Sequence, residues 1–558
     1  MSLTFEEIKR DAKSIISIDD KKNYKLIIPL INNLTIDEND LSSDEFWDEN
    51  EQRLRFIVVS LFQVFKQLFS REDMTIRSAK TDETKQLRTW CRKLFENFKD
   101  KLLVILSSIP FETSIALDSL DVYMQCIELE AIYFSSNVDD PYFPTKTYQK
   151  LLVALWDSDF GDEELKNGQS QNATLVEFKD NYYQKFADVQ FYFNSEFNKL
   201  LTDSNEDERY TSSNSIGKWL TVVNHDVHCD LPNNDDLEVY VANPPKLVED
   251  VSKFKSNFEK NWLYILNGFL SVDQYKTILL ILHKRIIPHF HTPTKLMDFL
   301  TDSYNVNFGK KEANSGIIPI LSLNGLFELM RRFNLEYPNF YSKLYQCLTP
   351  DLMHVKYRSR FFRMLELFLS STHISSHLVA SFIKKLARLT LQAPPSAIVT
   401  VIPFTYNLLK KHPTCMIMLH NPAFIDDPFG SDEQKAELKR LKLAYNDPYD
   451  PEETNPELTN AIGSSLWELL TLVDHYHTNV ASLAKIFAQP FRKLNYNMED
   501  FLDWGYDSLL KAEVDRKLKV SPSLEYDTFD DIFANDTSRT EKGDVLGSDS
   551  IFIEGVDW

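Results

Sequence analysis

The chain has 558 residues, with 61 Lys and Arg against 83 Asp and Glu, so its formal net charge is −22. Glycine is scarce at 13 residues, about a third of the usual share of roughly 7%, and neither a G-x-G-x-x-G nor a P-loop motif occurs. The five cysteines are widely spaced without a C-x-x-C pair, which favours a reducing compartment. The counts therefore leave dinucleotide-binding, P-loop and disulfide-rich classes without support and disfavour an all-β fold.

Helical periodicity runs through the chain. Between Leu54 and Phe69, apolar residues recur at three- and four-residue spacing, which predicts one helix with a buried stripe. Only 238–242 is locally strand-like. Further helices are predicted at 87–106, 113–134, 147–157, 177–201, 257–269, 274–287, 293–304, 319–334, 338–348, 358–371, 375–391, 397–411, 464–476, 478–488 and 498–511.

Many antiparallel helices joined by short turns cannot share one compact core. We therefore expect an all-α fold, an irregular HEAT- or armadillo-like α-solenoid with acidic disordered loops and a disordered C-terminal tail. No fixed repeat period is visible, which disfavours tetratricopeptide, ankyrin and leucine-rich repeats. Low-order regions are expected at 37–51, 202–215 and 425–457, where Asp, Glu, Asn, Ser or Pro are abundant.

The longest uncharged stretch, 389–409, is long enough to span a membrane. It contains Pro394, Pro395 and Pro403 together with several polar residues. We therefore expect two buried helical pieces around a Pro-Pro turn rather than a transmembrane helix. The first residues show no basic region followed by an apolar one, so no secretory signal is expected either.

Charge is distributed unevenly. From 253 to 420 there are 21 Lys and Arg against 9 Asp and Glu, a net of +12, whereas the rest of the chain carries −34. The tail at 521–558 has 10 acidic against 2 basic residues, but it also holds apolar groups that suggest two short docking motifs, on this protein or on a partner. The predicted regions are an N-terminal helical array at 1–245, a basic helical domain at 253–424, an acidic connector at 425–460, C-terminal helices at 461–515 and an acidic tail with docking motifs at 516–558.

The densest basic segment is 356–363 (KYRSRFFR), at the start of a predicted helix. Arginine binds phosphate bidentately and an exposed tyrosine can stack on an unpaired base. Equally, the phenylalanines fit a helix core face whose cations are merely solvated. The candidates for contact with RNA or an acidic partner are Lys284, Arg285, Arg331, Arg332, Lys356, Tyr357, Arg358, Arg360, Arg363, Lys384, Lys385 and Arg388, which form a site only if they converge in space.

Metal and catalytic signals are weak. The cluster 225–229 (HDVHC) lacks a fourth donor nearby, and the histidines of 289–291 (HFH) are expected to fill a Pro-bounded turn and cap the helix beginning near Thr292. No G-x-S-x-G motif and no isolated carboxylate pair in an apolar setting occurs. We therefore predict no catalytic, cofactor-binding or metal-binding residue, and we do not expect an enzyme.

Several segments together carry a family resemblance. They are 283–300 (HKRIIPHFHTPTKLMDFL), 323–341 (LNGLFELMRRFNLEYPNFY), 352–363 (LMHVKYRSRFFR), 381–389 (SFIKKLARL), 411–422 (KHPTCMIMLHNP), 465–469 (SLWEL) and 498–504 (MEDFLDW). These segments resemble the CCAAT-binding-factor (CBF) type family of nucleolar complex proteins, which assigns the basic domain to the CBF type. The similarity runs from about 50 to 510 and recurs at the C-terminal 555–558 (GVDW).

This resemblance implies a helical scaffold of the small-subunit processome in the nucleus and nucleolus. It implies a heterodimer with nucleolar protein 14 and a role in small-subunit rRNA processing, pre-ribosome assembly and export. It supplies no catalytic residue and no cofactor. Other processome proteins are implied as partners, with weak or indirect contact to pre-rRNA. A membrane and sequence-specific DNA are not expected, because no DNA-reading motif is present. The alternative is a HEAT-type nuclear transport receptor or adaptor, since acidity and helix content fit that class too.

Overall fold

The computed structural model describes residues 3–17, 21–34, 44–75, 82–108, 113–135, 140–158, 165–166, 168–203, 210–224, 238–305, 317–333, 337, 339–371, 373–425 and 430–517. The chain divides into two compact units, Met1–Leu502 and Asp503–Trp558. In the described part of the chain, the backbone forms helices and two isolated bridges but no paired strands. The expected all-α fold is confirmed.

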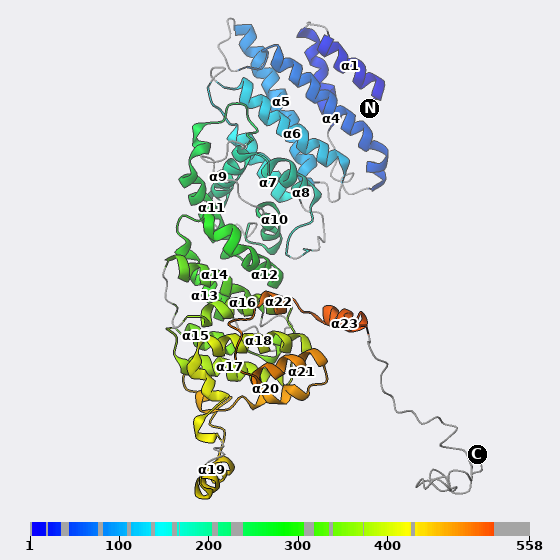
Figure 1. Ribbon diagram of the computed structural model, residues 1–558. Coiled ribbons are helices and arrows are strands. Elements are labelled where there is room, and N and C mark those ends of the chain that lie inside the picture. Colours follow the sequence, from blue (N-terminus) through cyan, green and yellow to red (C-terminus); the bar gives the residue numbers. More distant parts are fainter. Residues whose placement is uncertain are drawn as a thin grey trace, which may run out of the picture. The chain divides into compact units, whose positions relative to one another are not determined.

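The first unit opens with a group of long helices (Figure 1). They are α1 (Phe5–Ser17), η1 (Lys21–Leu26), α2 (Ile27–Asn32), α4 (Asp44–Ser70), α5 (Asp82–Ser108), α6 (Ser114–Tyr133) and α7 (Thr145–Asp157). Helix α4 packs against α1 and α6, and α5 packs against α6 and α7. The apolar stripes meet between them: the rings of Phe65 and Phe98 stack with centroids 5.3 Å apart.

One polar cluster is buried inside this group. Lys99 of α5 forms an ion pair with Glu130 of α6, and both side chains are almost fully buried. Thr147 of α7 donates its hydroxyl to Glu130 Oε2 over 2.7 Å. The carboxylate therefore joins three helices, and its hydrogen-bonding needs are met inside the core.

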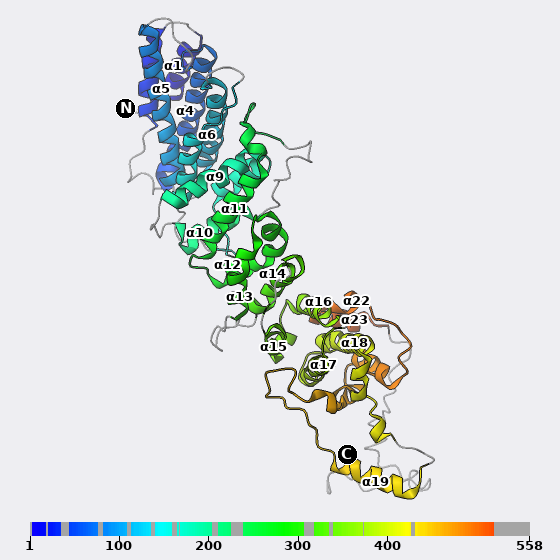
Figure 2. The same ribbon diagram turned by 90° about the vertical axis from the view of Figure 1, so that its left-hand side faces the viewer.

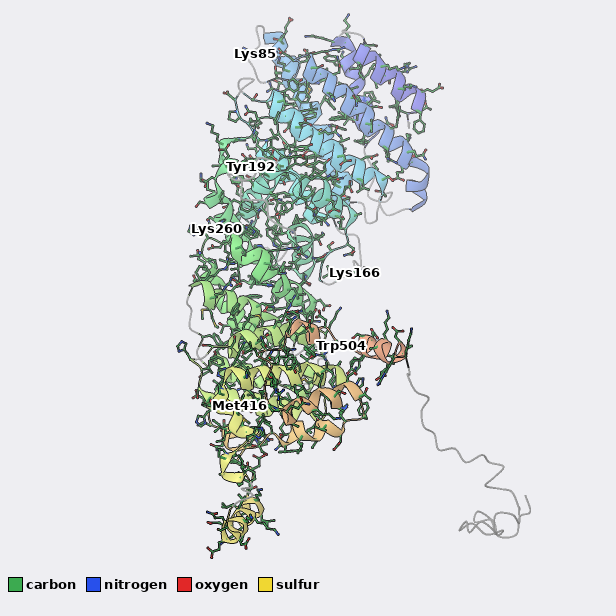
Figure 3. All side chains as sticks on the ribbon, in the orientation of Figure 1. Lys85, Lys166, Tyr192, Lys260, Met416 and Trp504 are labelled. Carbon is green, nitrogen blue, oxygen red and sulfur yellow. The ribbon has the colours of Figure 1, made fainter. Side chains whose placement is uncertain are left out.

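The middle of the unit continues the array. Its elements are α8 (Ala173–Phe178), a π-helical turn η2 (Lys179–Tyr183), α9 (Ala187–Asp203), α10 (Ser213–Val223), η5 (Lys246–Glu249), α11 (Val251–Leu266), α12 (Val272–Ile281), a second π-helical turn η6 (Leu282–Ile286), η7 (Ile287–His289), η8 (Pro293–Leu296), α13 (Met297–Asn305) and α14 (Ile317–Phe333). Packing passes from α7 to α9, from α9 to α11, and from α12 to α14. Tyr192 of α9, labelled in Figure 3, stacks on Phe143 with ring centroids 3.9 Å apart. Helices thus bury their stripes against neighbours close in the chain, as in a solenoid.

The predicted continuous helix 177–201 is interrupted, and the strand-like segment 238–242 explains why. Glu238 forms an isolated bridge with Phe186, just before α9. The buried carboxylate of Asp188 accepts the backbone N–H groups of Tyr240 and Val241, each over 2.9 Å. The Asp188 side chain binds the backbone of 240–241, and the bridge binds the backbone at the helix break before α9. Together they hold 238–242 in place without a partner strand.

The last part of the first unit holds α15 (Phe340–Gln346), η9 (Pro350–Met353), α16 (Arg358–Leu369), α17 (Ser376–Thr390), α18 (Pro395–Lys411), η10 (Pro413–Met418), η11 (Pro422–Phe424), α19 (Asp432–Ala444), η12 (Ala461–Gly463), α20 (Trp467–Thr471), η13 (Leu472–Asp474), α21 (Thr478–Ala484), η14 (Lys485–Ala488) and α22 (Glu499–Leu502). Here the chain folds back, because α18 packs against α21 and α22 (Figure 2). The Asn407 amide accepts the Tyr496 N–H and donates to the Tyr496 carbonyl, both over 2.8 Å. The second unit contains α23 (Tyr506–Val514), so the predicted helix 498–511 is interrupted at 503–505.

The uncharged stretch 389–409 behaves as expected. It forms the end of α17 and most of α18, separated by a turn in which Pro394 precedes the helix and Pro395 is its first residue. Nearly every residue of α18 is buried. Across the described residues, no helix combines the length and apolarity needed to cross a membrane.

All three low-order predictions were wrong in part. Helix α19 lies inside 425–457, where a serine N-cap and Gln434 form a capping box, so its charged composition did not prevent helix formation. Helix α4 begins at Asp44, inside 37–51, and α10 begins at Ser213, inside 202–215. The tail at 521–558 and its predicted docking motifs lie outside the described residues.

Candidate basic contact surface

Positions from η6, α14 and α16 lie together around His283. Helix α14 contacts both η6 and α16. Burial lowers the pKa of His283, the charges of Arg360 and Lys284 lower it further, and Glu328 of α14 opposes them. Segments of the basic domain that are far apart in sequence therefore converge. The His283 surface, as it is termed below, comprises Lys284, Arg331, Arg332, Lys356, Tyr357, Arg360 and Arg363.

Arg360 is the cation of this surface with unmet hydrogen-bonding capacity. Its Nη1 atom is buried and finds no acceptor among the described residues, and the same holds for Nδ1 of His283. Burial lowers the pKa of Arg360, Tyr357 opposes this, and the neighbouring cation Arg363 lowers it further. Arg360 as a whole is only half-buried, and a carboxylate or phosphate oxygen beside its guanidinium group would offset the cost of burying the cation.

The other members of the His283 surface differ in how far their charge is already neutralised. Arg363 makes a two-pronged contact with Glu499 of α22, Nε to Oε1 over 2.9 Å and Nη2 to Oε2 over 2.6 Å. Arg331 and Arg332 both pair with Glu328, at 3.3 Å and 2.8 Å. By contrast, the side chains of Lys284 and Lys356 are exposed. The available positive charge thus concentrates on Lys284, Lys356 and Arg360.

Two predicted contact residues serve the interior instead. Arg285 donates from Nη1 to the carbonyl and side-chain oxygens of Asn224, over 2.9 Å and 2.6 Å. Arg358 is buried at the first position of α16 and donates from Nη1 to the Met353 carbonyl over 2.9 Å. Its role is to hold η9 against α16, so we no longer propose it as a contact to a partner.

Two of the predicted residues on α17, Lys384 and Arg388, form a separate group with Asp447 and Glu468, termed the Lys384 cluster. The side chains of Lys384 and Glu468 are 0% exposed, and Lys384 Nζ lies 2.7 Å from Glu468 Oε1. Arg388 Nε lies 2.8 Å from the same oxygen. Partial burial raises the pKa of Asp447, but hydrogen bonds from Ser464 and the Tyr449 N–H, with both cations, hold it below its ordinary value. These contacts tie α17 to the returning segment 445–468 and leave Lys384 no surface for a partner.

Lys385 is also committed internally. It donates from Nζ to the Tyr345 carbonyl over 2.8 Å, and the same atom lies 3.9 Å from the centre of the Tyr345 ring. Burial lowers the pKa of Lys385 to about 8, opposed by Cys347. Its ammonium group therefore anchors α17 to the end of α15.

The counter-ions of these basic residues could not be found from the sequence. Glu468 lies 84 positions from Lys384, and Glu499 lies 136 positions from Arg363. Helical spacing predicts pairs three or four residues apart, as with Glu328 and Arg332, but not pairs made when a chain folds back. Both acidic residues lie in segments of the family resemblance, 465–469 and 498–504, which gave no role for them.

The histidine predictions have mixed outcomes. The 225–229 cluster lies outside the described residues. After 289–291, the Glu259 carboxylate of α11 holds the start of the following helix: it accepts the Thr292 N–H over 2.6 Å and the Thr292 hydroxyl over 3.0 Å, and pairs with Lys295. One carboxylate can accept all three donors at once. The expected capping by the histidines stays a prediction. No group of three or more metal-ligating side chains occurs in the described ranges.

Comparison with known proteins identifies the family. The chain is 60% identical to Nucleolar complex protein 4 of Saccharomyces cerevisiae over 562 residues, covering 100% of both chains. The chain belongs to the nucleolar complex protein 4 family. It is also 33% identical to Nucleolar complex protein 4 homolog A of Xenopus laevis, over 79% of this chain and 78% of that one, and 29% identical to the homolog of Danio rerio, over 87% and 88%.

Two family models match separate parts of the chain. The CBF/Mak21 family model matches residues 319–484, which confirms the CBF-type resemblance. The model described as Nucleolar complex protein 4-like, TPR repeats, matches residues 7–207. Our expectation that tetratricopeptide repeats are disfavoured was therefore wrong for this region. Its helices range from 6 residues in α2 to 27 in α4, and such unequal lengths conceal a fixed period of about 34 residues.

Membership of this family makes the chain a nucleolar factor of ribosome biogenesis. The matched family models and relatives give no support to the transport-receptor alternative, and none describes an enzyme.

Proposed function

We propose that the chain is a non-enzymatic scaffold of the small-subunit processome that binds nucleolar protein 14 and acts in small-subunit rRNA processing, pre-ribosome assembly and export. The observation that supports it best is full-length similarity, at 60% identity, to Nucleolar complex protein 4. A helical array suits this role because it holds distant sites at fixed geometry.

Within this scaffold, the regions take separate tasks. The N-terminal array at 1–245 and the C-terminal helices at 461–515 present protein-binding surface, the CBF-type domain at 253–424 carries the basic contacts, 425–460 connects them, and the tail at 516–558 docks through short motifs. Protein contacts dominate over direct RNA contacts because the whole chain carries a charge of −22.

The His283 surface is the part of the scaffold that contacts pre-rRNA phosphate. Its support is the proximity of Lys284 and Arg360 at His283, with the exposed Lys356 four residues before Arg360 in the chain. The surface reads no sequence, because phosphate contacts position a protein without specifying bases.

The first test is purification of a tagged chain at low and then high salt, with identification of the proteins and RNA retained. We expect one protein partner, nucleolar protein 14, to survive high salt, and precursor rRNA to be released. Recovery of a small GTPase and cargo without ribosomal precursors would make the transport-receptor alternative correct.

A second test addresses the surface itself. Charge reversal of Lys284, Lys356 and Arg360 to Glu should abolish retention of precursor rRNA at low salt while leaving the protein partner bound. The matched control reverses Lys66, Lys93 and Lys101 of α4 and α5, which lie outside the basic domain. Unchanged rRNA retention in the first variant would remove the His283 surface from the proposal.

A further inference from the structure

Helix α19 stands out because none of its residues is buried. It lies at the margin of the first unit, apart from α17 and α18 (Figures 1 and 2). Leu441 is 52% exposed and Leu443 is 81% exposed. A helix of 13 residues with no buried residue is marginal in water, because helices of this length gain most of their stability from burying an apolar face.

The second half of α19 joins apolar and basic residues. Between Leu438 and Ala444, three leucines alternate with Lys439, Arg440 and Lys442, whereas the acidic residues of the helix lie in its first half. Acidic residues at the beginning and basic residues at the end suit the helix dipole. The dipole gives no reason for exposed leucines at the same end.

A groove adjoins this half of the helix. Its volume is about 250 Å³, and it is lined by Ile417, Met418, Leu419, Asn421, Phe424, Lys442, Tyr445, Gly463, Ser464 and Ser465. Lys442 is the one charged residue of this lining. The lining is mixed, with the apolar side chains of Ile417, Met418, Leu419 and Phe424 beside hydroxyl and amide groups, and its one charged group is a cation. Such a groove suits an apolar side chain flanked by carboxylates.

The groove is held open by defined contacts. Tyr445 donates its hydroxyl to the Gly463 carbonyl over 2.9 Å, and its ring meets the Phe424 ring edge-on, with centroids 5.4 Å apart. The end of α19 is thereby fixed against η11 and the 463–465 turn. Leu438 and Leu441 lie at helical spacing from Lys442 and Tyr445, so they share the face of the helix that adjoins the groove, whereas Leu443 lies on another face.

We propose that this surface, the second half of α19 with the adjoining groove, binds an acidic amphipathic segment of a protein partner. An apolar side chain of the segment enters the groove, its other apolar residues cover Leu438 and Leu441, and its Asp and Glu residues face Lys439 and Lys442. The site is distinct from the His283 surface and does not depend on the proposed RNA contact.

The test measures binding to the full chain by fluorescence anisotropy. The probe is a labelled peptide of about four helical turns, with Leu and Phe at helical spacing and Asp and Glu elsewhere. One control peptide has the same composition with the apolar residues scattered, and a second has Lys in place of each acidic residue. We expect the first peptide to bind, with affinity falling as salt rises, and both controls to bind at least about tenfold more weakly.

Variants locate the binding. Leu438→Asp with Leu441→Asp should lower the affinity about tenfold or more, as should Lys439→Glu with Lys442→Glu. Because α19 has no buried residue, these changes leave the core intact, which far-UV circular dichroism and the melting temperature will verify. The matched control is Leu494→Asp, at an apolar residue 83% exposed outside this surface, and it should bind as the parent does.

Three outcomes would overturn the proposal. The first is failure of the acidic peptide to bind, or equal loss in the Leu494→Asp control. The second is concentration-dependent dimerisation of the parent that the leucine variants abolish, since the occupant would then be a second copy. The third is tighter binding of single-stranded RNA or anionic phosphatidylserine vesicles than of the acidic peptide, with loss in the Lys439→Glu and Lys442→Glu variant.

Discussion

Three buried carboxylates each join at least two helical elements of this chain. Glu130, Glu259 and Glu468 each lie almost wholly inside the protein and each receives a lysine ammonium group from another element. A buried carboxylate is costly without donors, and removing one partner leaves the other charge uncompensated. Each of these three carboxylates therefore stabilises the contact between the helical elements that it joins.

The Lys99 and Glu130 pair gives the first prediction. Glu130→Leu should destabilise the chain by about 3–5 kcal/mol, because the buried Lys99 ammonium loses its buried counter-ion and keeps only the half-exposed Glu96. The double variant Lys99→Met with Glu130→Leu should recover at least half of this loss, since an apolar pair leaves no buried charge. The measurement is the midpoint of urea unfolding by circular dichroism. Glu96→Leu removes the other partner of Lys99, a side chain that is 49% exposed; it should cost less, and an equal loss there would contradict the prediction.

Glu259 gives a prediction for pH. Burial raises its pKa, but hydrogen bonds from Lys295 and Thr292 outweigh burial and hold the pKa below the ordinary value. A carboxylate whose pKa is depressed by folding stabilises the protein at neutral pH, and this contribution is lost as pH falls through the folded-state pKa. The stability difference between the parent and Glu259→Gln should be about 1–3 kcal/mol at pH 7.

The same difference should shrink as pH falls below the ordinary glutamate pKa of about 4.3, because the unfolded chain takes up the proton first and the folded carboxyl group only at lower pH. Urea unfolding of both proteins between pH 7 and pH 3 measures it. The exposed Glu433→Gln variant of α19 controls for loss of one surface charge. A difference that is constant with pH would mean that Glu259 acts through packing alone.

At the scale of elements, the sequence predicted helices better than their ends and contacts. Periodicity located α4, α5, α14, α16 and α18 because each buries a continuous apolar stripe. It missed the break before α9, because Asp188 binds the backbone of a segment 52 positions away. It missed α19 because a helix without a buried face has no stripe to detect.

The candidate contact residues fell into two groups for the same reason: some lie on a common surface and others point into the protein. The segment 356–363 was found because its cations are adjacent in sequence, and the structure places Arg360 near His283. Lys384 followed the same local rule, yet its side chain points into the protein to reach Glu468, 84 positions away. The spacing of residues in the sequence shows that a cation lies on a helix. It does not show which distant residue pairs with the cation, because that contact forms only when the chain folds back.

Helix α17 gives a prediction at this scale. Glu468→Ala should cost about 3–5 kcal/mol and open the segment 445–468 to proteases, because Lys384 loses a buried counter-ion. The matched control is Glu499→Ala, which breaks the half-exposed contact with Arg363 and should cost about 0–1 kcal/mol. Limited proteolysis with mass spectrometry locates the cleavage. Equal protection of 445–468 in both variants would show that the Lys384 cluster does not hold this segment.

For the whole molecule, the balance between a charge of −22 and a basic region of +12 sets how it meets RNA. Exposed charges interact over only about 8 Å at physiological salt. The acidic parts of the chain therefore weaken its association with RNA in general, whereas the His283 surface attracts RNA only where a phosphate touches it. The proposed phosphate contact should then appear as a small number of released counter-ions rather than as high affinity.

The salt dependence of binding tests this directly. The purified chain should bind single-stranded RNA weakly, and Arg360→Gln should reduce the slope of log K against log salt by about 0.7, which corresponds to one lost phosphate contact. Arg10→Gln, at an α1 side chain 74% exposed outside the basic region, should leave the slope unchanged. An unchanged slope in Arg360→Gln would mean that no phosphate reaches this guanidinium group. Arg360 would then pair with a carboxylate of a protein partner, and Arg360→Gln would lower the stability of that complex instead of the affinity for RNA.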